Sequence, residues 1–268
     1  MTLAEVLRGA TDYLAARGVP SPRVDAEHLL AAALGLQRIE LYTQHDRPLT
    51  ESERDAVREL VRRRGAREPL AYVLGEWGFR RLVLRTDARA LVPRPETEIV
   101  VDRCLALLEG RQHPRVLDVG TGTGAIALSI ATEHPGAQVT ATDLSADALA
   151  LAGENADRLG LHVTFIEADL VDGDGYDLVV SNPPYVLAGE LELLEPEVRD
   201  FEPRAALVDE GQTERLAQAH PGEWLVLEVH EARATELERL LQTLGYTETR
   251  VTSDLALRPR VVEGRWTS

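Results

Sequence analysis

The stretch VLDVGTGTGAIALSIA, residues 116–131, constrains the fold of this chain more than any other. An apolar run that can form a buried strand leads into Gly120, Gly122 and Gly124, and an apolar, helix-forming run follows. Glycines allow a tight turn and a close approach of the backbone to a ligand, while the free N–H groups that begin the helix attract polar or anionic groups. Asp143 ends the next predicted strand, where a carboxylate can accept hydrogen bonds from both ribose hydroxyls of a nucleoside.

This pattern predicts a site for a nucleoside-containing cofactor, which Asp143 and the glycine loop would bind. The candidate residues of the loop are Gly120, Thr121, Gly122, Thr123 and Gly124. The loop also satisfies the dinucleotide fingerprint GxGxxA, so that NAD and S-adenosylmethionine both fit it. A glycine turn that binds no ligand is the simplest alternative.

A second acid follows the third predicted strand, in the stretch EADL at 167–170. Asp169 is placed to contact the edge of an adenine ring, and Leu170 to pack on its face. On spacing alone, an acid in a surface turn explains Asp169 equally well.

From residue 115 onward, strand and helix patterns alternate, which is the signature of a parallel sheet. The predicted strands are 115–119, 138–142, 163–167, 176–181 and 224–229, and the predicted helices are 125–133, 146–159 and 233–244. Two β-type runs, 247–251 and 258–262, can close the chain as an antiparallel hairpin. We therefore predict an α/β fold with a Rossmann-like, doubly wound, mostly parallel sheet.

The first 65 residues differ, because their apolar residues recur at helical spacing. Thr50 and Glu53 form a capping-box pattern at the start of one of these helices. The arginines near its end predict either a solvated face or a partner-binding edge; they are Arg58, Arg62, Arg63, Arg64 and Arg67. We expect a small all-helical domain at 1–67, a linker with a β-hairpin at 68–92, and a catalytic domain at 93–268.

The stretch VVSNPPYV, residues 179–186, ends the fourth predicted strand in a rigid, extended loop, because proline has a fixed φ and no N–H. The carboxyl ends of the strands in a doubly wound sheet form the ligand crevice, so this loop should face the glycine loop. The Asn182 side-chain oxygen and the Pro183 carbonyl are two acceptors on a stiff backbone. A substrate –NH₂ group has two N–H donors to offer them.

Such an arrangement suits the methylation of a planar nitrogen whose lone pair is delocalised. Two hydrogen bonds favour a more tetrahedral nitrogen and strengthen as positive charge develops during transfer. No strong general base is required, since the nitrogen becomes acidic once it is alkylated. Tyr185 offers a π face to the substrate group or to the cationic centre. A loop that merely ends a strand is the alternative.

The composition restricts the class of protein further. The chain has 268 residues, of which 44% are hydrophobic, and it lacks both an apolar run of about 18 residues and a signal-peptide pattern. A single cysteine, Cys104, agrees with a reducing cytoplasm, and the histidines show no metal-ligand spacing, so no metal is expected. The net charge of −16 argues against a nucleic acid as main partner.

Several motifs together resemble the release factor glutamine methyltransferases, a family of class I S-adenosylmethionine-dependent enzymes. They are LVPRPETE (91–98), VLDVGTGTGAIAL (116–128), SNPPYV (181–186) and FEPRAAL (201–207), and EPLAYVLGEWGF (68–79) fits the linker of that family. The resemblance implies methyl transfer to the side-chain amide nitrogen (N5) of the glutamine in the Gly-Gly-Gln motif of bacterial class I peptide chain release factors. It implies S-adenosylmethionine as cofactor, S-adenosylhomocysteine as product, and N-terminal helices that help to bind the factor.

By position, the resemblance assigns roles to the motifs above. The glycine loop, Asp143, Leu170 and Asn182 would bind the cofactor, and residues 182–185 (Asn182, Pro183, Pro184 and Tyr185) would hold the glutamine, with the loop Pro93–Glu96 nearby. We take Asn182, Pro183 and Tyr185 as the candidate catalytic residues. Two departures from the family are a short segment between Leu207 and Trp224 and His230 in place of a glycine.

Two other functions are compatible with parts of the sequence. An N-methyltransferase of a nucleobase amino group, in ribosomal RNA or DNA, meets the same planar –NH₂ group with a similar Asn-Pro-Pro-aromatic loop, although the helical extra domain and the acidic charge disfavour it. A non-catalytic binding protein on this scaffold is the other alternative, and hydride transfer is disfavoured because it has no use for the NPPY loop.

Overall fold

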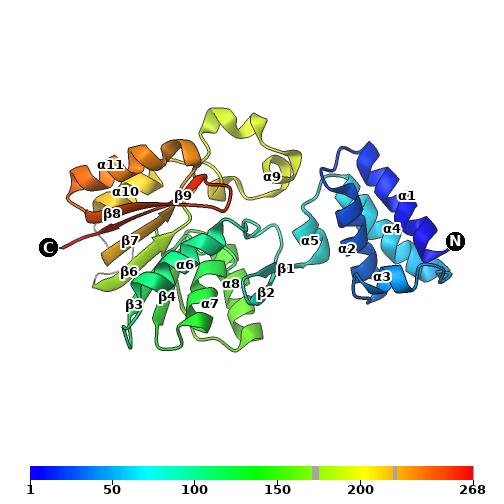
Figure 1. The fold of residues 1–268 in the computed structure, drawn as a ribbon, viewed down its shortest axis with the longest axis horizontal. Helices are drawn as coiled ribbons and strands as arrows, with labels where there is room; N and C mark the ends of the chain where they lie inside the picture. The colour runs from blue at the N-terminus through cyan, green and yellow to red at the C-terminus, as the bar shows by residue number, and fades with distance from the viewer. Residues whose placement is uncertain (171–174, 220–221, 268) are drawn as a thin grey trace. The chain divides into compact units, whose positions relative to one another are not determined.

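The computed structural model describes residues 1–170, 175–219 and 222–267, which form two compact units (Figure 1). The first unit comprises Met1–Glu76 together with Glu195–Phe201, and the second comprises Trp77–Leu194 and Glu202–Ser268. The chain therefore passes between the two units three times. A short segment that follows the NPPY loop in sequence belongs to the N-terminal unit.

The N-terminal unit is helical, as the spacing of its apolar residues predicts. Its helices are α1 (Leu3–Ala16), α2 (Pro22–Leu34), α3 (Glu40–Thr43), α4 (Glu51–Gly65), α5 (Leu70–Leu74) and α9 (Pro196–Phe201). The predicted capping box is present at the start of α4: the Thr50 hydroxyl accepts from the Glu53 N–H, and the Glu53 carboxylate accepts from the Thr50 N–H. The core of the unit contains fully or nearly fully buried leucines, among them Leu3, Leu7, Leu14, Leu29 and Leu30.

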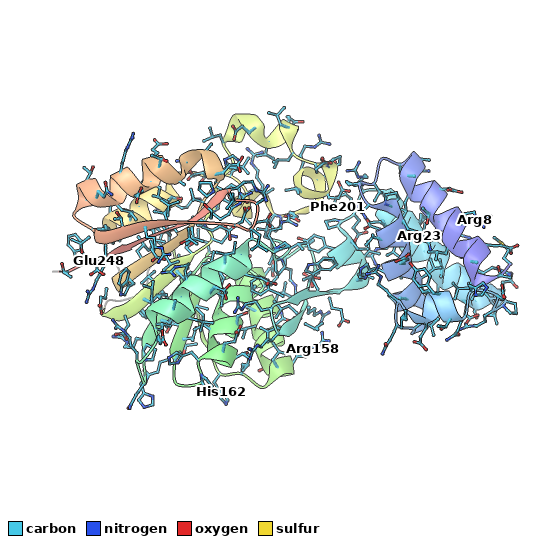
Figure 2. The ribbon with its side chains drawn as sticks, in the orientation of Figure 1. Arg8, Arg23, Arg158, His162, Phe201 and Glu248 are labelled. Atoms are coloured by element: carbon cyan, nitrogen blue, oxygen red, sulfur yellow. The ribbon has the colours of Figure 1, made fainter. Side chains whose placement is uncertain are left out.

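A buried acid joins α2 to the segment that follows it. Glu27 is only 3% exposed, and its carboxylate accepts hydrogen bonds from Arg23, which Figure 2 labels, and from Arg38, each at 2.7 Å. The Tyr42 hydroxyl donates a third hydrogen bond, at 2.5 Å. Burial raises the pKa of Glu27, but these three donors outweigh it and lower the pKa to about 2. The ionised carboxylate therefore fixes the turn between α2 and α3.

The arginines at the end of α4 divide into two groups. Arg58 and Arg62 lie on the exposed face and pair with acids of their own helix, which agrees with a solvated face. Arg64 is instead 5% exposed, donates to Asp25 of α2 at 2.7 Å and lies 2.8 Å from Glu197 of α9. Arg67 also pairs with Glu197. These two arginines therefore hold α9 within the helical unit, a role that the sequence did not reveal.

The linker contains the predicted hairpin and one element that was not predicted. Strands β1 (Glu76–Phe79) and β2 (Leu82–Arg85) pair in a two-stranded sheet. Helix α5 precedes them, between Pro69 and Gly75, where only β-type runs were expected. A five-residue apolar run is too short to show helical periodicity, which explains the omission.

A seven-stranded sheet organises the second unit, in the order β5-β4-β3-β6-β7-β9-β8. Its strands are β3 (Arg115–Val119), β4 (Gln138–Asp143), β5 (Thr164–Glu167), β6 (Tyr176–Ser181), β7 (Gly222–Glu228), β8 (Thr247–Ser253) and β9 (Pro259–Arg265). The five strands from β5 to β7 are parallel, while β9 runs antiparallel to β7 and to β8. The predicted mostly parallel sheet with a closing hairpin is therefore confirmed.

Helices cover both faces of this sheet (Figure 1). They are α6 (Thr97–Leu107), α7 (Ala125–Glu133), α8 (Ala146–Leu159), α10 (Gln212–Ala219) and α11 (Ala234–Leu244), with short 3₁₀ turns at Ala188–Leu193, Arg204–Ala206 and Glu231–Arg233. Neighbouring residues of β3 face opposite sides: Val116 packs in the core with α6 and α7, and Leu117 packs in the core with α10 and α11. Both faces are buried, so the carboxyl ends of the strands are the edge at which a ligand can bind.

Candidate active site

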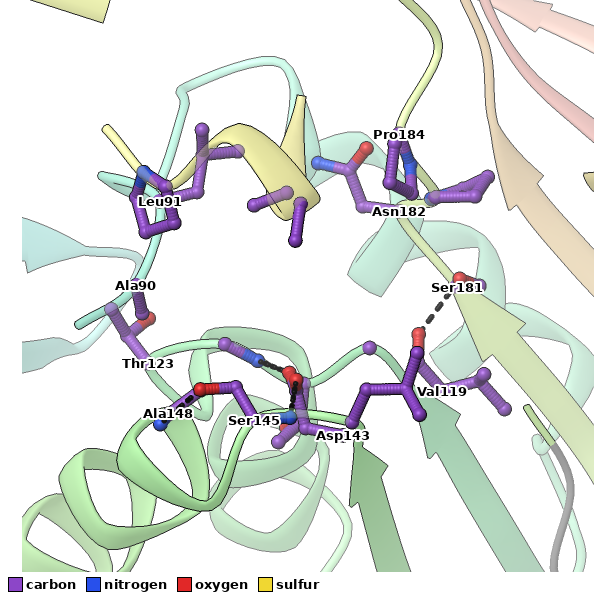
Figure 3. A pocket seen from close by; sticks show the side chains of 18 of the residues that line it. Ala90, Leu91, Val119, Thr123, Asp143, Ser145, Ala148, Ser181, Asn182 and Pro184 are labelled. Carbon is purple, nitrogen blue, oxygen red and sulfur yellow. Dashed lines mark hydrogen bonds between the residues drawn. The ribbon is translucent and has the colours of Figure 1, made fainter. Parts of the chain in front are cut away.

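One cavity of about 320 Å³ opens at the carboxyl ends of β3, β4, β5 and β6 (Figure 3). All of its lining residues belong to the second unit. Nearly all the candidate residues line it: Gly120, Thr121, Gly122, Thr123, Asp143, Asp169, Leu170, Asn182, Pro183 and Pro184. The other two candidates, Gly124 and Tyr185, are not among the described residues that line the cavity.

The glycine loop joins β3 to α7 through backbone conformations that only glycine adopts without strain. Gly120, Gly122 and Gly124 have φ values of 72°, 57° and 84°. A Cβ atom on Gly124 would lie 2.9 Å from the Leu128 side chain, so this glycine permits helix packing as well as the turn. The sequence therefore predicted the loop, whereas the structural reason for its third glycine is the contact with α7.

A buried acid, Asp118, stabilises the glycine loop through hydrogen bonds. Both the Thr121 hydroxyl, at 2.7 Å, and the Ala127 N–H, at 3.1 Å, donate to Oδ2 of Asp118. Asp118 is fully buried, and burial raises its pKa to about 7, although these two donors oppose the shift. Asp118 thus connects the end of β3 to the first turn of α7.

Asp143 presents an oriented carboxylate at the end of β4. Its Oδ2 accepts from the Gly122 N–H at 2.9 Å, and its Oδ1 accepts from the Ser145 N–H at 2.9 Å (Figure 3). These bonds fix the side chain between the glycine loop and α8. The carboxylate has lone pairs left for hydroxyl donors, which is what binding to a ribose requires.

The acid after β5 has a different environment. Asp169 lines the cavity and pairs with Arg215 of α10, at 3.1 and 3.2 Å, with both side chains half exposed. Leu170 has a φ of 71°, and its carbonyl accepts from the Thr142 hydroxyl at 3.0 Å. The hydrogen bond holds the Leu170 backbone in a conformation unusual for leucine, and the Leu170 side chain also joins the core under α10 and α11.

The NPPY loop begins where β6 ends, next to the glycine loop. The Ser181 hydroxyl donates to the Val119 carbonyl at 2.7 Å, which ties the two strand ends together (Figure 3). Asn182 follows, and its Nδ2 donates to the Thr97 hydroxyl at 3.3 Å. Because the bond uses the nitrogen end of the amide, Oδ1 is the end that can accept from a substrate.

Tyr185 does not line the cavity, unlike Asn182, Pro183 and Pro184 of the same loop. The centroid of its ring lies 6.2 Å from that of the His230 ring. Burial raises the pKa of the Tyr185 hydroxyl, and the nearby Glu228 carboxylate raises it further. His230 also caps a short turn, where its ring nitrogen accepts from the Ala232 N–H at 3.3 Å. His230 therefore places a second ring beside Tyr185.

Three polar residues around the NPPY loop were not predicted from the sequence: Thr97, Glu202 and Glu228. Arg94 of the loop Pro93–Glu96 donates to both oxygens of buried Glu202, at 2.7 and 2.8 Å. Burial raises the pKa of Glu202, and Arg94 opposes that shift. Thr97 lies in the quoted stretch LVPRPETE, Glu202 in FEPRAAL and Glu228 in the predicted strand 224–229, but nothing in these stretches shows that the three residues lie near one another.

Two features are absent from the parts of the chain that the structure covers. No cluster of three or more His, Cys, Asp or Glu side chains among them could hold a metal ion. Nor is any helix within these same residues long and apolar enough to cross a membrane.

Comparisons with known proteins agree with this architecture. Residues 5–75 match the family described as PrmC N-terminal domain, and residues 100–220 match the family described as Methyltransferase small domain. The catalytic domain of hMettl16, solved in complex with MAT2A 3′UTR hairpin 6, has a TM-score of 0.57 and 18% identity, and covers 69% of this chain and 76% of that one. This likeness concerns the fold alone. The match to the methyltransferase small domain, together with the sheet order and the glycine loop, shows that the chain has the fold of a class I methyltransferase.

The particular family follows from proteins that match over nearly their whole length. A release factor glutamine methyltransferase of Geobacter sulfurreducens is 40% identical over 278 residues, covering 98% of this chain and 96% of that protein. One from Deinococcus radiodurans is 42% identical over 278 residues, covering 99% of each. The chain belongs to the release factor glutamine methyltransferase family.

Proposed function

We propose that this enzyme transfers a methyl group from S-adenosylmethionine to the side-chain amide nitrogen (N5) of the glutamine in the Gly-Gly-Gln motif of bacterial class I peptide chain release factors. The observation that carries the proposal is that Asn182 and Pro183 line the same cavity as the glycine loop and Asp143. A donor of methyl groups and a planar –NH₂ group can therefore meet there. The modified glutamine would modulate translation termination.

The residues of the cavity fit the cofactor. Gly120 and Gly122 have no side chains, so a ligand in the cavity can approach their backbone closely. The Asp143 carboxylate, held by its two hydrogen bonds, can accept from ribose hydroxyls. Leu170 offers an apolar surface to a purine ring, and Asp169, although paired with Arg215, lies at the same wall. S-adenosylmethionine supplies a methyl group already activated by a sulfonium, so positioning is the main task left to the protein.

Asn182 and Pro183 perform that positioning on the substrate side. The Asn182 Oδ1 and the Pro183 carbonyl accept the two N–H groups of the glutamine amide, which orients the nitrogen toward the methyl donor. Both hydrogen bonds strengthen as the nitrogen loses its amide resonance and gains positive charge, so they stabilise the transition state more than the ground state. The prolines at 183 and 184 keep the acceptors in place, since their φ angles are fixed.

Glutamine, rather than a nucleobase, is favoured by three observations. The relatives named above are release factor glutamine methyltransferases and match the chain from end to end. The N-terminal unit is helical and matches a family defined for that domain. The net charge of −16 opposes binding to a phosphate backbone. We also propose a cytoplasmic location, where release factors act.

A methylation assay tests this function. Purified enzyme with methyl-labelled S-adenosylmethionine is incubated with a release factor, with the same factor carrying Gln→Ala in its Gly-Gly-Gln motif, and with ribosomal RNA and DNA in parallel. We expect label on the intact factor alone, and mass spectrometry should locate it on the glutamine. Label in nucleic acid only would make the chain a nucleobase methyltransferase, and no labelling in the presence of bound cofactor would favour a binding protein.

A further inference from the structure

The turn that joins β8 to β9, residues 254–258, carries two strongly exposed leucines (Figure 1). Leu255 is completely exposed and Leu257 is 85% exposed, so that neither side chain buries much apolar surface within its own chain. A single exposed leucine is common on a protein surface, but two of them on one short turn form a small apolar patch. We call Leu255 and Leu257 the tip leucines.

Hydrogen bonds to Asp254, which is buried, hold this turn together. The Asp254 carboxylate accepts from the N–H groups of Ala256, at 2.8 Å, and Arg258, at 2.9 Å. The Arg258 side chain donates to the same carboxylate at 2.8 Å, and the Asp254 carbonyl accepts from the Leu257 N–H at 2.9 Å. The tip leucines therefore stand on an ordered turn, which a partner does not have to order when it binds.

Leu257 has a backbone conformation that leucine rarely adopts. Its φ is 62°, in the left-handed region where glycine or asparagine is far more common. The side chain does not offset this strain by packing, because it is exposed. The folded chain alone thus gives no reason for a leucine at position 257, whereas a partner that covers the side chain does.

The turn lies at the same edge of the sheet as the cavity. Strand β6, whose carboxyl end leads into the NPPY loop, is parallel to β7, and the antiparallel β9 begins beside the carboxyl end of β7. Arg258 of the turn also pairs with Glu96, with 3.6 Å between the guanidinium and the carboxylate. Glu96 ends the loop Pro93–Glu96, in which Pro93 and Arg94 line the cavity. The turn that carries the tip leucines is therefore adjacent to the cavity wall.

The proposed substrate requires a binding surface outside the cavity. A Gly-Gly-Gln motif offers one amide side chain and two glycines, which have no side chain that an enzyme could recognise. Much of the affinity for an intact release factor must therefore come from contacts beyond the motif, at the rim of the cavity. Burial of apolar side chains is the largest favourable contribution to most such contacts.

We propose that the tip leucines bind an apolar patch on the release factor next to its Gly-Gly-Gln motif and so contribute to the affinity for the intact factor. The inference rests on the proposed function, because it takes the release factor as the substrate. The position of the turn beside the loop Pro93–Glu96 favours this occupant, since a factor whose glutamine enters the cavity must cover the neighbouring rim. The contact involves neither the cofactor nor the reacting nitrogen, so it should affect binding of the factor and not methyl transfer.

Two single variants, Leu255→Ser and Leu257→Asn, and the double variant that combines them test the proposal. The measured quantities are kcat and KM for the intact release factor, the Kd for a factor with Gln→Ala in its Gly-Gly-Gln motif, the Kd for S-adenosylmethionine, and the Tm. We expect each single variant to raise KM and the factor Kd by about 10-fold, the size of one buried leucine side chain, and the double variant to raise them further. The values of kcat and of the cofactor Kd should change by less than about twofold.

The Tm of Leu257→Asn separates binding from structural support. Asparagine tolerates a φ of 62° better than leucine does, so this variant should keep or raise the Tm while it raises KM. Val83 of β2 provides the matched control, because it is an exposed apolar residue of the same unit that does not line the cavity. Val83→Ser should leave both KM and the factor Kd unaltered.

Three results would overturn the proposal. In the first, the double variant keeps the wild-type KM and factor Kd. In the second, KM rises only in variants whose Tm falls, which would assign the loss to a disturbed fold. In the third, sedimentation shows a dimeric wild type and a monomeric double variant, which would assign the tip leucines to a contact between two copies of this chain. A wild type that never labels the factor would refute the proposed function itself and is recognised before any variant is made.

Discussion

The two walls of the cavity are held together in different ways. On the glycine-loop wall, the stabilising hydrogen bonds join residues that are close in sequence: Thr121 and Asp118 are 3 positions apart, and Gly122 and Asp143 are 21 apart. On the NPPY wall, Asn182 bonds to Thr97 across 85 positions, and the Arg94–Glu202 pair spans 108. The first wall is encoded in contiguous motifs, whereas the second exists only after the chain has folded.

The largest effect is expected from the side chain at the tip of the second wall. Asn182→Ala removes one of the two acceptors for the substrate amide, and we expect kcat to fall by about 100-fold to 1,000-fold, as when one transition-state hydrogen bond is lost. The Kd for S-adenosylmethionine should change by less than about threefold, since the glycine loop and Asp143 are untouched. Steady-state kinetics and calorimetric binding measure the two quantities.

Asn155 provides the control, because it is the other asparagine of the chain. It is fully buried and bonds to the backbone of Arg85, at 2.7 and 3.1 Å, and to the Thr123 carbonyl, at 3.0 Å. Asn155→Ala should lower the free energy of unfolding by about 2 kcal/mol and leave the turnover of the folded enzyme far higher than that of Asn182→Ala. Wild-type kcat in Asn182→Ala would refute the two-acceptor mechanism.

The contrast between the walls explains what the sequence could predict. The strands from 115 to 181, helices α7 and α8, and the turn between them follow from apolar periodicity and from glycines with positive φ, which are local properties. The NPPY residues were located for the same reason. Thr97 and Glu228 were not found, because an acid at the end of an apolar strand has no local signature until β7 is placed beside α6.

The next prediction concerns the first wall and separates two glycines of one loop. Gly124→Ala places a methyl group 2.9 Å from Leu128 and 3.3 Å from Ala152 at a φ of 84°, and we expect a loss of about 2 kcal/mol in the free energy of unfolding. Gly120 has a similar φ of 72° but open space around it, so that Gly120→Ala should cost only about 1 kcal/mol. Chemical denaturation measures the free energy of unfolding of both variants. Equal losses would show that backbone strain, and not the contact with Leu128, determines the cost of Gly124→Ala.

The helical unit shows the same limit of local information. The capping box at Thr50 was predicted, whereas the buried arginine Arg64 was grouped with exposed arginines of the same helix. Its partner Glu197 is more than a hundred residues away and belongs to a helix of only six residues. A run of arginines does not reveal which member is buried, since the burial depends on a segment inserted from elsewhere in the chain.

A smaller effect is expected from the ion pair of the second wall. Glu202→Gln keeps the shape of the side chain but removes the charge that binds Arg94, so the loop Pro93–Glu96 should loosen beside the substrate. We expect the KM for the release factor to rise by about 10-fold with little change in the cofactor Kd. Glu133→Gln, which breaks the pair with Arg80 outside the cavity, is the control and should leave KM unaltered. A change of cofactor Kd instead of KM would contradict this assignment.

The smallest effect on turnover is expected from Asp118, the buried acid that accepts hydrogen bonds from the glycine loop, because its titration is expected to change only the pH dependence of stability. Burial raises the pKa of Asp118 from its ordinary value of 3.8 to about 7 in the folded protein, so between these two pH values the folded state retains a proton that the unfolded state has lost. The unfolded state binds fewer protons between these pH values, and stability therefore falls as the pH rises.

Asp118→Asn does not titrate, and its single side-chain oxygen can still accept from Thr121 and Ala127, both of which bond to Oδ2 in the wild type. The Tm of the variant minus that of the wild type should therefore increase by on the order of 10 °C from pH 4 to pH 7 and then level off. Glu228 also has a raised pKa, but it is present in both proteins and cancels in the difference. If the Tm values of the two proteins instead change with pH in the same way across this range, Asp118 is already ionised in the folded protein.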